Sequence, residues 1–147
     1  MRTPNLESRA DGLPFFEGAR RPPRIEGPQI LVVEDEEPIA AGLTECLEAE
    51  GFTVEWLSSG AGVESRILAN PPLLLIMDVQ LGDANGHAIY CALRAAGCWM
   101  PIILMSGSAT LTTRELDESS AFLAKPFAVE DLLRTAASLN VFPSATS

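Results

Sequence analysis

Five polar residues follow short apolar runs of the sequence, and their side-chain types could together handle a phosphoryl group. Glu34 and Asp35 follow residues 30–33, and Asp78 follows residues 73–77. Ser106 follows residues 101–105, and Lys125, the only lysine of the chain, follows residues 121–124. A carboxylate nucleophile, acids that bind a cation, a hydroxyl and a fixed ammonium are the groups needed for phosphoryl transfer to an aspartate.

The three acids also predict a metal ion. Three carboxylates in one crevice would raise one another's pKa values unless a cation lay among them. Glu34, Asp35 and Asp78 offer hard oxygen ligands, and Mg²⁺ uses one or two carboxylates directly while keeping several waters. We therefore expect Mg²⁺ at this place, with Lys125 as a second positive charge.

The elements that would position these residues form a regular alternation. Apolar, β-branched runs predict strands, and segments with apolar residues on one face predict helices. The expected strands cover residues 30–33, 53–57, 73–77, 101–105 and 121–124, and the expected helices cover residues 38–50, 61–69, 88–96, 110–116 and 128–140. This alternation predicts an α/β, doubly wound, five-stranded parallel sheet, in which ligands bind outside the carboxyl ends of the strands.

Composition and charge exclude some classes of partner. The 147 residues suffice for one domain, and 20 acidic against 10 basic residues give a net charge of −10. An acidic chain is poorly suited to nucleic acid or to an anionic membrane surface, so we expect neither as a partner. The three cysteines form no CxxC pair, and we find neither a signal peptide nor an apolar run of about 20 residues, so we expect a cytoplasmic location.

The two ends of the chain differ from its middle. Residues 1–28 are rich in Pro, Gly and Arg without periodicity, and we expect a flexible N-terminal extension there. Within it, Leu13-Pro14-Phe15-Phe16 is a short apolar cluster that could bind either to the domain or to a partner. We expect the domain to cover residues 29–141 and a short C-terminal tail to cover residues 142–147.

Four motifs in order resemble the receiver domain of two-component response regulators, over residues 29–140. They are Val33-Glu34-Asp35-Glu36, Met77-Asp78-Val79-Gln80-Leu81, Met105-Ser106-Gly107-Ser108 and Phe122-Leu123-Ala124-Lys125-Pro126-Phe127. The resemblance implies a flavodoxin-like, CheY-like fold with strand order 2-1-3-4-5.

The resemblance also implies a role for each matching residue at the acidic site. Asp78 corresponds to the phosphoacceptor, and Asp35 to the acid that binds Mg²⁺ directly. Glu34 corresponds to a second acid that acts through water, and Gln80 to the residue whose backbone carbonyl binds the metal.

The remaining matches concern the response to phosphorylation. Ser106 corresponds to the hydroxyl residue that turns toward the phosphoryl group, and Lys125 to the lysine that pairs with it. Phe122 corresponds to the aromatic switch residue, and the Lys125–Pro126 peptide bond is expected to be cis.

Two departures from the family pattern affect its expected behaviour. Gly82 and Asn85 replace a usual Pro and a common Asp, which predicts a more mobile loop after Asp78. The segment between Ser106 and Lys125 is about one helical turn short, which predicts a brief or irregular fourth helix.

Three functions follow from these observations. The first is a stand-alone receiver that accepts a phosphoryl group on Asp78 from a sensor histidine kinase or a phosphotransfer protein and signals through contacts with an unidentified protein target. The second is a degenerate receiver that binds partners independently of phosphorylation. The third, a phosphohydrolase acting on external substrates, is disfavoured because such enzymes typically have an acid at the position of Gln80; we expect no enzyme of that kind.

Overall fold

The computed structural model describes residues 29–107 and 116–141. The predicted extension at residues 1–28 and the predicted tail at residues 142–147 lie outside the described residues, as do Ser108 and the predicted fourth helix up to residue 115. The predicted domain limits therefore stay predictions.

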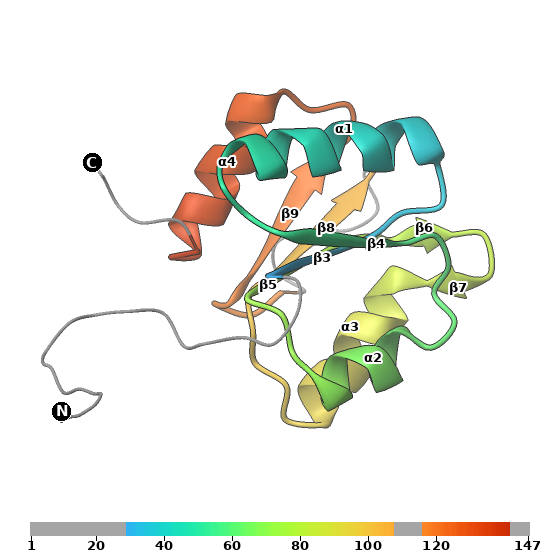
Figure 1. Cartoon of the computed structure of the whole chain (residues 1–147). Coiled ribbons are helices and arrows are strands. Elements are labelled where there is room, and N and C mark those ends of the chain that lie inside the picture. Colours follow the sequence, from blue (N-terminus) through green and yellow to red (C-terminus); the bar gives the residue numbers. More distant parts are fainter. Residues whose placement is uncertain (1–28, 108–115, 142–147) are drawn as a thin grey trace, which may run out of the picture.

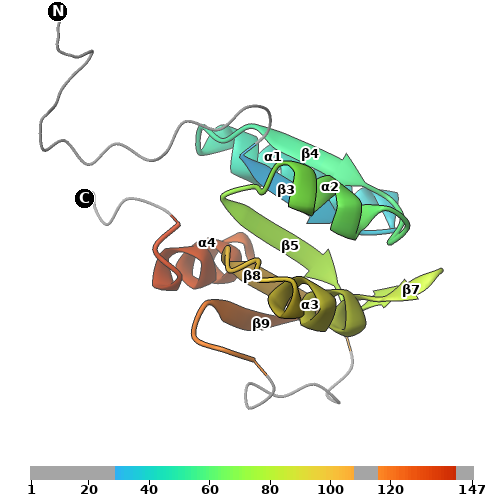
Figure 2. The same ribbon diagram turned by 90° about the horizontal axis from the view of Figure 1, so that it is seen from below.

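Five parallel strands form one sheet, in the order β4-β3-β5-β8-β9 (Figure 2). Along the chain they are β3 (Ile30–Val33), β4 (Val54–Leu57), β5 (Leu74–Asp78), β8 (Ile102–Ser106) and β9 (Ser120–Ala124). The predicted order 2-1-3-4-5 is confirmed. Every residue of β3, β5 and β8 is buried, because both faces of a doubly wound sheet are covered.

Helices cover both faces of this sheet (Figure 1). On one side lie α1 (Glu37–Ala49) and α4 (Val129–Ser138), and on the other lie α2 (Val63–Ala69) and α3 (Gly86–Ala95). Alternate residues of each central strand contribute to two separate apolar clusters, so that Val32 packs toward α1 and α4 and Val33 packs toward α2 and α3. Among the described helices, none has the length and apolar character needed to cross a bilayer.

Local signals explain where the helices begin and end. Pro38 occupies the first turn of α1, where its missing N–H costs nothing, and Gly51 follows the helix with a φ of 97°. The side chain of Asn85 caps α3 by accepting hydrogen bonds from the backbone N–H groups of His87 and Ala88.

The segment after Asp78 differs from the predicted loop. It contains a short antiparallel pair, β6 (Gln80–Leu81) and β7 (Ala84–Asn85). Between them, Asp83 accepts hydrogen bonds from the Ser59 hydroxyl and the Gly60 N–H, which lower the pKa of its carboxyl. Strands of two residues are too short to show an alternating pattern, so the sequence could not indicate them.

Candidate functional site

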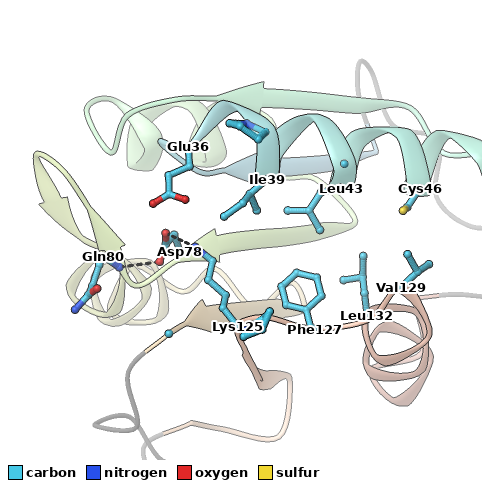
Figure 3. Close-up of a pocket in the computed structure, with 14 residues that line it drawn as sticks. Glu36, Ile39, Leu43, Cys46, Asp78, Gln80, Lys125, Phe127, Val129 and Leu132 are labelled. Carbon is cyan, nitrogen blue, oxygen red and sulfur yellow. Dashed lines mark hydrogen bonds and ion pairs between the residues drawn. The ribbon is translucent and has the colours of Figure 1, made fainter.

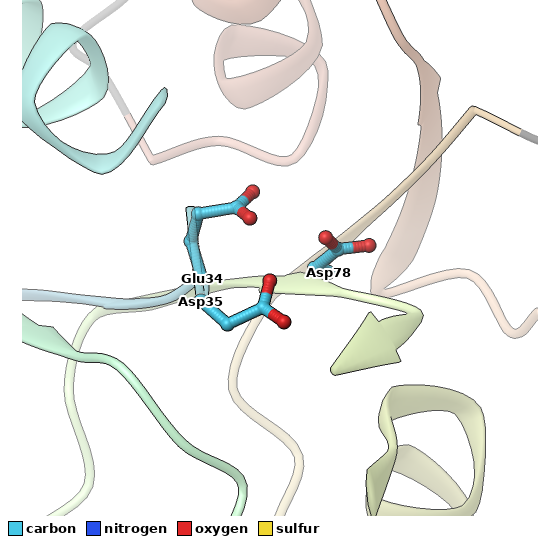
Figure 4. A group of neighbouring side chains, drawn as sticks. All are labelled: Glu34, Asp35 and Asp78. Atoms are coloured by element: carbon cyan, nitrogen blue, oxygen red, sulfur yellow. The ribbon is translucent and has the colours of Figure 1, made fainter. Parts of the chain in front are cut away.

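Three carboxylates meet at the carboxyl ends of β3 and β5. The register of these strands places Val33 beside Met77, so Glu34 and Asp78, one residue further on, lie side by side. Glu34, Asp35 and Asp78 each offer an oxygen that lies within 4.8 Å of the other two (Figure 4). Glu34 and Asp78 are buried, whereas Asp35 is exposed.

Lys125 provides the positive charge of this cluster. Its Nζ donates a hydrogen bond to Oδ2 of Asp78 at 2.8 Å and lies 3.0 Å from Oε1 of Glu34. Its backbone N–H donates to the carbonyl of Ser106, and the Lys125–Pro126 peptide bond is cis. The end of β9 is therefore joined to the ends of β3 and β5 by one ammonium group.

Burial and charge act in opposite directions on these groups. Burial raises the pKa of Glu34, and the nearby Asp78 charge adds to this, while Lys125 and the N–H of Glu36 oppose it. Burial alone would lower the pKa of Lys125, but contacts with Asp78 and Glu34 outweigh it and raise that pKa. The site thus holds the ammonium in its charged form.

Backbone N–H groups fix the individual carboxylates. Oδ1 of Asp78 accepts from the N–H of Gln80 at 3.0 Å, and Oε2 of Glu34 accepts from the N–H of Glu36 at 3.1 Å. Oδ2 of Asp35 accepts from the N–H of Gly82 at 3.0 Å, which links the first strand end to the β6–β7 turn.

The two residues predicted to respond to phosphorylation lie on neighbouring strands. Ser106 ends β8 and is buried, only 2% exposed. Phe122 pairs with Leu104 in the sheet and is partly buried against the apolar cluster beneath α2 and α3. The structure therefore places Ser106 at the edge of the sheet where the acids meet, and Phe122 two residues before the end of β9.

Comparison with known proteins decides the family. A model of the response regulator receiver domain matches residues 30–137. The chain belongs to this family. It is 32% identical over 114 residues to the swarming motility regulation protein RssB of Serratia marcescens, covering 76% of this chain and 52% of that protein. It is 35% identical over 109 residues to the transcriptional regulatory protein CusR of Escherichia coli, covering 71% of this chain and 48% of that protein.

Solved structures agree on the receiver fold. The CheY-like receiver domain from Methanospirillum hungatei superposes with a TM-score of 0.65 at 25% identity, covering 74% of this chain and 89% of that one. The Vibrio cholerae chemotaxis protein CheY4 gives a TM-score of 0.66 at 23% identity, covering 75% and 96%. The chain spans about half the length of the curated relatives it matches.

The donor set of this receiver domain fits Mg²⁺. All three side chains offer carboxylate oxygens, which suit a hard cation. Oε1 of Glu34 is buried and, within the described residues, receives no hydrogen bond of regular geometry, although Nζ of Lys125 is near. A water bound to a metal would supply this oxygen with a well-aligned donor.

Sequence reasoning missed three supports of the receiver site. The indole N–H of Trp56 donates to the carbonyl of Glu34, and the N–H of Gly82 donates to Asp35. Gly86 lies so close to Asp78 that a Cβ on it would overlap the Asp78 carbonyl. The spacing of Gly86 after Asp78 was a possible signal, but the two long-range donors leave no trace in the sequence.

Proposed function

We propose that this receiver domain accepts a phosphoryl group on Asp78 from a phosphohistidine of a sensor histidine kinase or a phosphotransfer protein. The observation that carries the proposal is the contact of Asp78 with Lys125 beside two further acids. A carboxylate paired with a fixed ammonium at the rim of a sheet is suited to receive an anionic group.

The transfer would proceed at one carboxylate oxygen. That oxygen attacks the phosphorus atom, the bond from phosphorus to the donor nitrogen breaks, and the imidazole leaves. Lys125 then pairs with an oxygen of the transferred group, because its Nζ already lies 2.8 Å from Asp78. Gln80 keeps the other Asp78 oxygen oriented through its backbone N–H.

We further propose that Asp35 and Asp78 hold Mg²⁺ directly, with Glu34 acting through water and Gln80 contributing its carbonyl. When bound, the ion would supply positive charge beside the phosphoryl oxygens. The clustering of the three acids supports this assignment.

Phosphorylation would be transmitted to a protein target by Ser106 and Phe122. Their positions at the end of β8 and on the adjacent strand β9 support the proposal, because β8 and β9 are paired along their whole length. We propose a cytoplasmic protein that signals through protein–protein contacts and does not act as an enzyme on external substrates.

The experiment is intact-mass spectrometry after incubation with acetyl phosphate and Mg²⁺. We expect one added phosphoryl group in the unaltered chain, and none after Asp78→Asn substitution or with EDTA. Equal phosphorylation of the Asp78→Asn variant would contradict the proposal. No addition from acetyl phosphate or from a phosphohistidine donor would instead favour a binding module that works without phosphorylation.

A further inference from the structure

A groove of about 580 Å³ separates α1 from α4 (Figure 3). It begins at the phosphoryl-acceptor site, where Asp78, Gln80 and Lys125 line it. Beyond the site its walls are apolar and come from both helices and the turn before α4: Ile39, Leu43, Cys46, Phe127, Val129 and Leu132.

The apolar part of the groove is open to a further chain segment. Val129 is 44% exposed although it faces the groove, and Cys46 is half-buried at the end farthest from Asp78. Apolar surface of this kind gains free energy when a hydrophobic segment covers it.

The described part of the chain begins near that far end. Phe52 follows α1 and donates its N–H to Leu47, and Thr53 exchanges hydrogen bonds with Gln29 at 2.9 and 3.1 Å. Gln29 therefore lies by the C-terminal end of α1, the end that carries Cys46. The residue to which the preceding segment is attached therefore lies near the end of the groove that Cys46 lines.

The preceding residues can reach into the groove. Leu13-Pro14-Phe15-Phe16 is separated from Gln29 by residues 17–28, which span at most about 40 Å when extended. The 13 residues of α1 are only about 20 Å long. The connecting stretch is therefore long enough to place both phenylalanines beside Leu43 and Val129.

Electrostatic attraction would also favour the presence of this segment near the groove. The two helices that form the groove carry Glu37, Glu45, Glu48, Glu130 and Asp131 against one cation, Arg134. Residues 1–28 carry five Arg and four acids, which sum to +1, so the rest of the chain sums to −11. Arg20, Arg21 and Arg24 lie in the connecting stretch, where they would pass along these acids.

We propose that Leu13-Pro14-Phe15-Phe16 of this chain binds in the groove between α1 and α4. The two aromatic rings fill the apolar part, and the arginines that follow pair with acids of the flanking helices.

Cys46 provides the test, since a bound segment would cover its thiol. The full chain is treated with iodoacetamide, and the rate of alkylation at each cysteine is measured by peptide mass spectrometry. In the Phe15→Ser/Phe16→Ser variant we expect Cys46 to react about tenfold faster. Cys91, which is exposed on α3, should keep its rate and serves as the internal control.

Two further variants locate the contact. Val129→Asp alters the opposite wall of the groove at an exposed position, and it should raise the alkylation rate of Cys46 about as much as the Phe15→Ser/Phe16→Ser change does. Combining the two changes should raise that rate no further. Leu6→Ser, an apolar residue outside the cluster, should leave the rate unchanged. Equal Cys46 rates in the full chain and the Phe15→Ser/Phe16→Ser variant would overturn the proposal. Protection that disappears on dilution would also overturn it, because a second copy would then be the occupant.

Discussion

The indole nitrogen of Trp56 donates a hydrogen bond to the backbone carbonyl of Glu34, with 2.6 Å between the two atoms. Trp56 lies on β4, the edge strand beside β3, and the bond extends the pairing of these strands past Val33. The carbonyl that accepts this bond belongs to Glu34, the first of the two adjacent acids Glu34 and Asp35. Trp56 is therefore both a support of the acidic site and a natural reporter of what binds there.

The first prediction concerns metal binding. The chain contains two tryptophans, so Trp99→Phe leaves Trp56 as the single indole. Titration of this variant with Mg²⁺ should change Trp56 fluorescence with a saturating curve. At ten times the dissociation constant, Mg²⁺ should also raise the free energy of unfolding by about 1.4 kcal/mol.

Asp35→Asn in the same background is the matched control for the metal. It removes one proposed ligand while its amide oxygen can still accept the N–H of Gly82. Both Mg²⁺ effects should disappear. A fluorescence change that survives Asp35→Asn would show that the ion binds elsewhere.

The second prediction concerns the close approach of α3 to the end of β5. Gly86→Ala should destabilise the domain by about 3 kcal/mol, because the new Cβ would overlap the Asp78 carbonyl. Helix propensity alone predicts the opposite sign, since Ala is favoured over Gly by about 1 kcal/mol. Urea denaturation decides between the two.

Gly82→Ala serves as the control for this crowding. A Cβ there would lie 3.4 Å from Oδ2 of Asp35, which is an ordinary van der Waals distance. Its effect should be much smaller than that of Gly86→Ala. Equal losses at both glycines would refute the packing argument.

The third prediction concerns the lysine of the site. Lys125→Met should lower the free energy of unfolding by about 3 kcal/mol without Mg²⁺, because two buried carboxylates lose their counter-charge. The comparison variant is Arg134→Met, whose ion pair with Asp131 is exposed at 74% and 48% and should contribute less than about 0.5 kcal/mol. Chemical denaturation of both variants in EDTA gives the comparison, and equal losses would count against the buried pair.

The fourth prediction concerns acid stability. Asp117, before β9, accepts hydrogen bonds from Arg94, Ser120 and Tyr90. Burial opposes these contacts but is outweighed, so the pKa of its carboxyl falls to about 2. A lowered pKa in the folded state stabilises the fold above the unfolded-state pKa, and this contribution disappears as the pH falls through the folded-state value.

Asp117→Asn should therefore cost about 2 kcal/mol at pH 7. About half of that difference between variant and wild type should vanish by pH 3, because the carboxyl is then mostly protonated in the unfolded state but still mostly charged in the folded state. Denaturation at the two pH values measures it. A difference independent of pH would mean that the carboxylate charge is not the source of the stability.

The sequence predicted the sheet well because buried parallel strands are continuous apolar runs. Leu74, Leu75 and Ile76 are all buried, as expected for a central strand. The approach of Lys125 to Asp78 was predicted for a related reason, because parallel strands end at the same edge of a sheet.

Other features depended on contacts that no spacing reveals. Arg94 bonds to Asp117, 23 residues away, and also to the carbonyls of Cys98 and Met100. The order of residues contains no sign of this network, because it is set by how α3 lies against the start of β9. The groove between α1 and α4 is likewise a property of packing, visible only once the helices are placed (Figure 3).

Mapping the phosphoryl group to a residue tests the central claim most directly. The chain is incubated with a phosphohistidine donor and Mg²⁺, and the acyl phosphate is then reduced with borohydride, which converts a phosphorylated aspartate to homoserine. Peptide mass spectrometry should find homoserine in place of Asp78 and unchanged aspartate at position 35. Homoserine at another position, or none while the donor loses its phosphoryl group to the chain, would contradict the account.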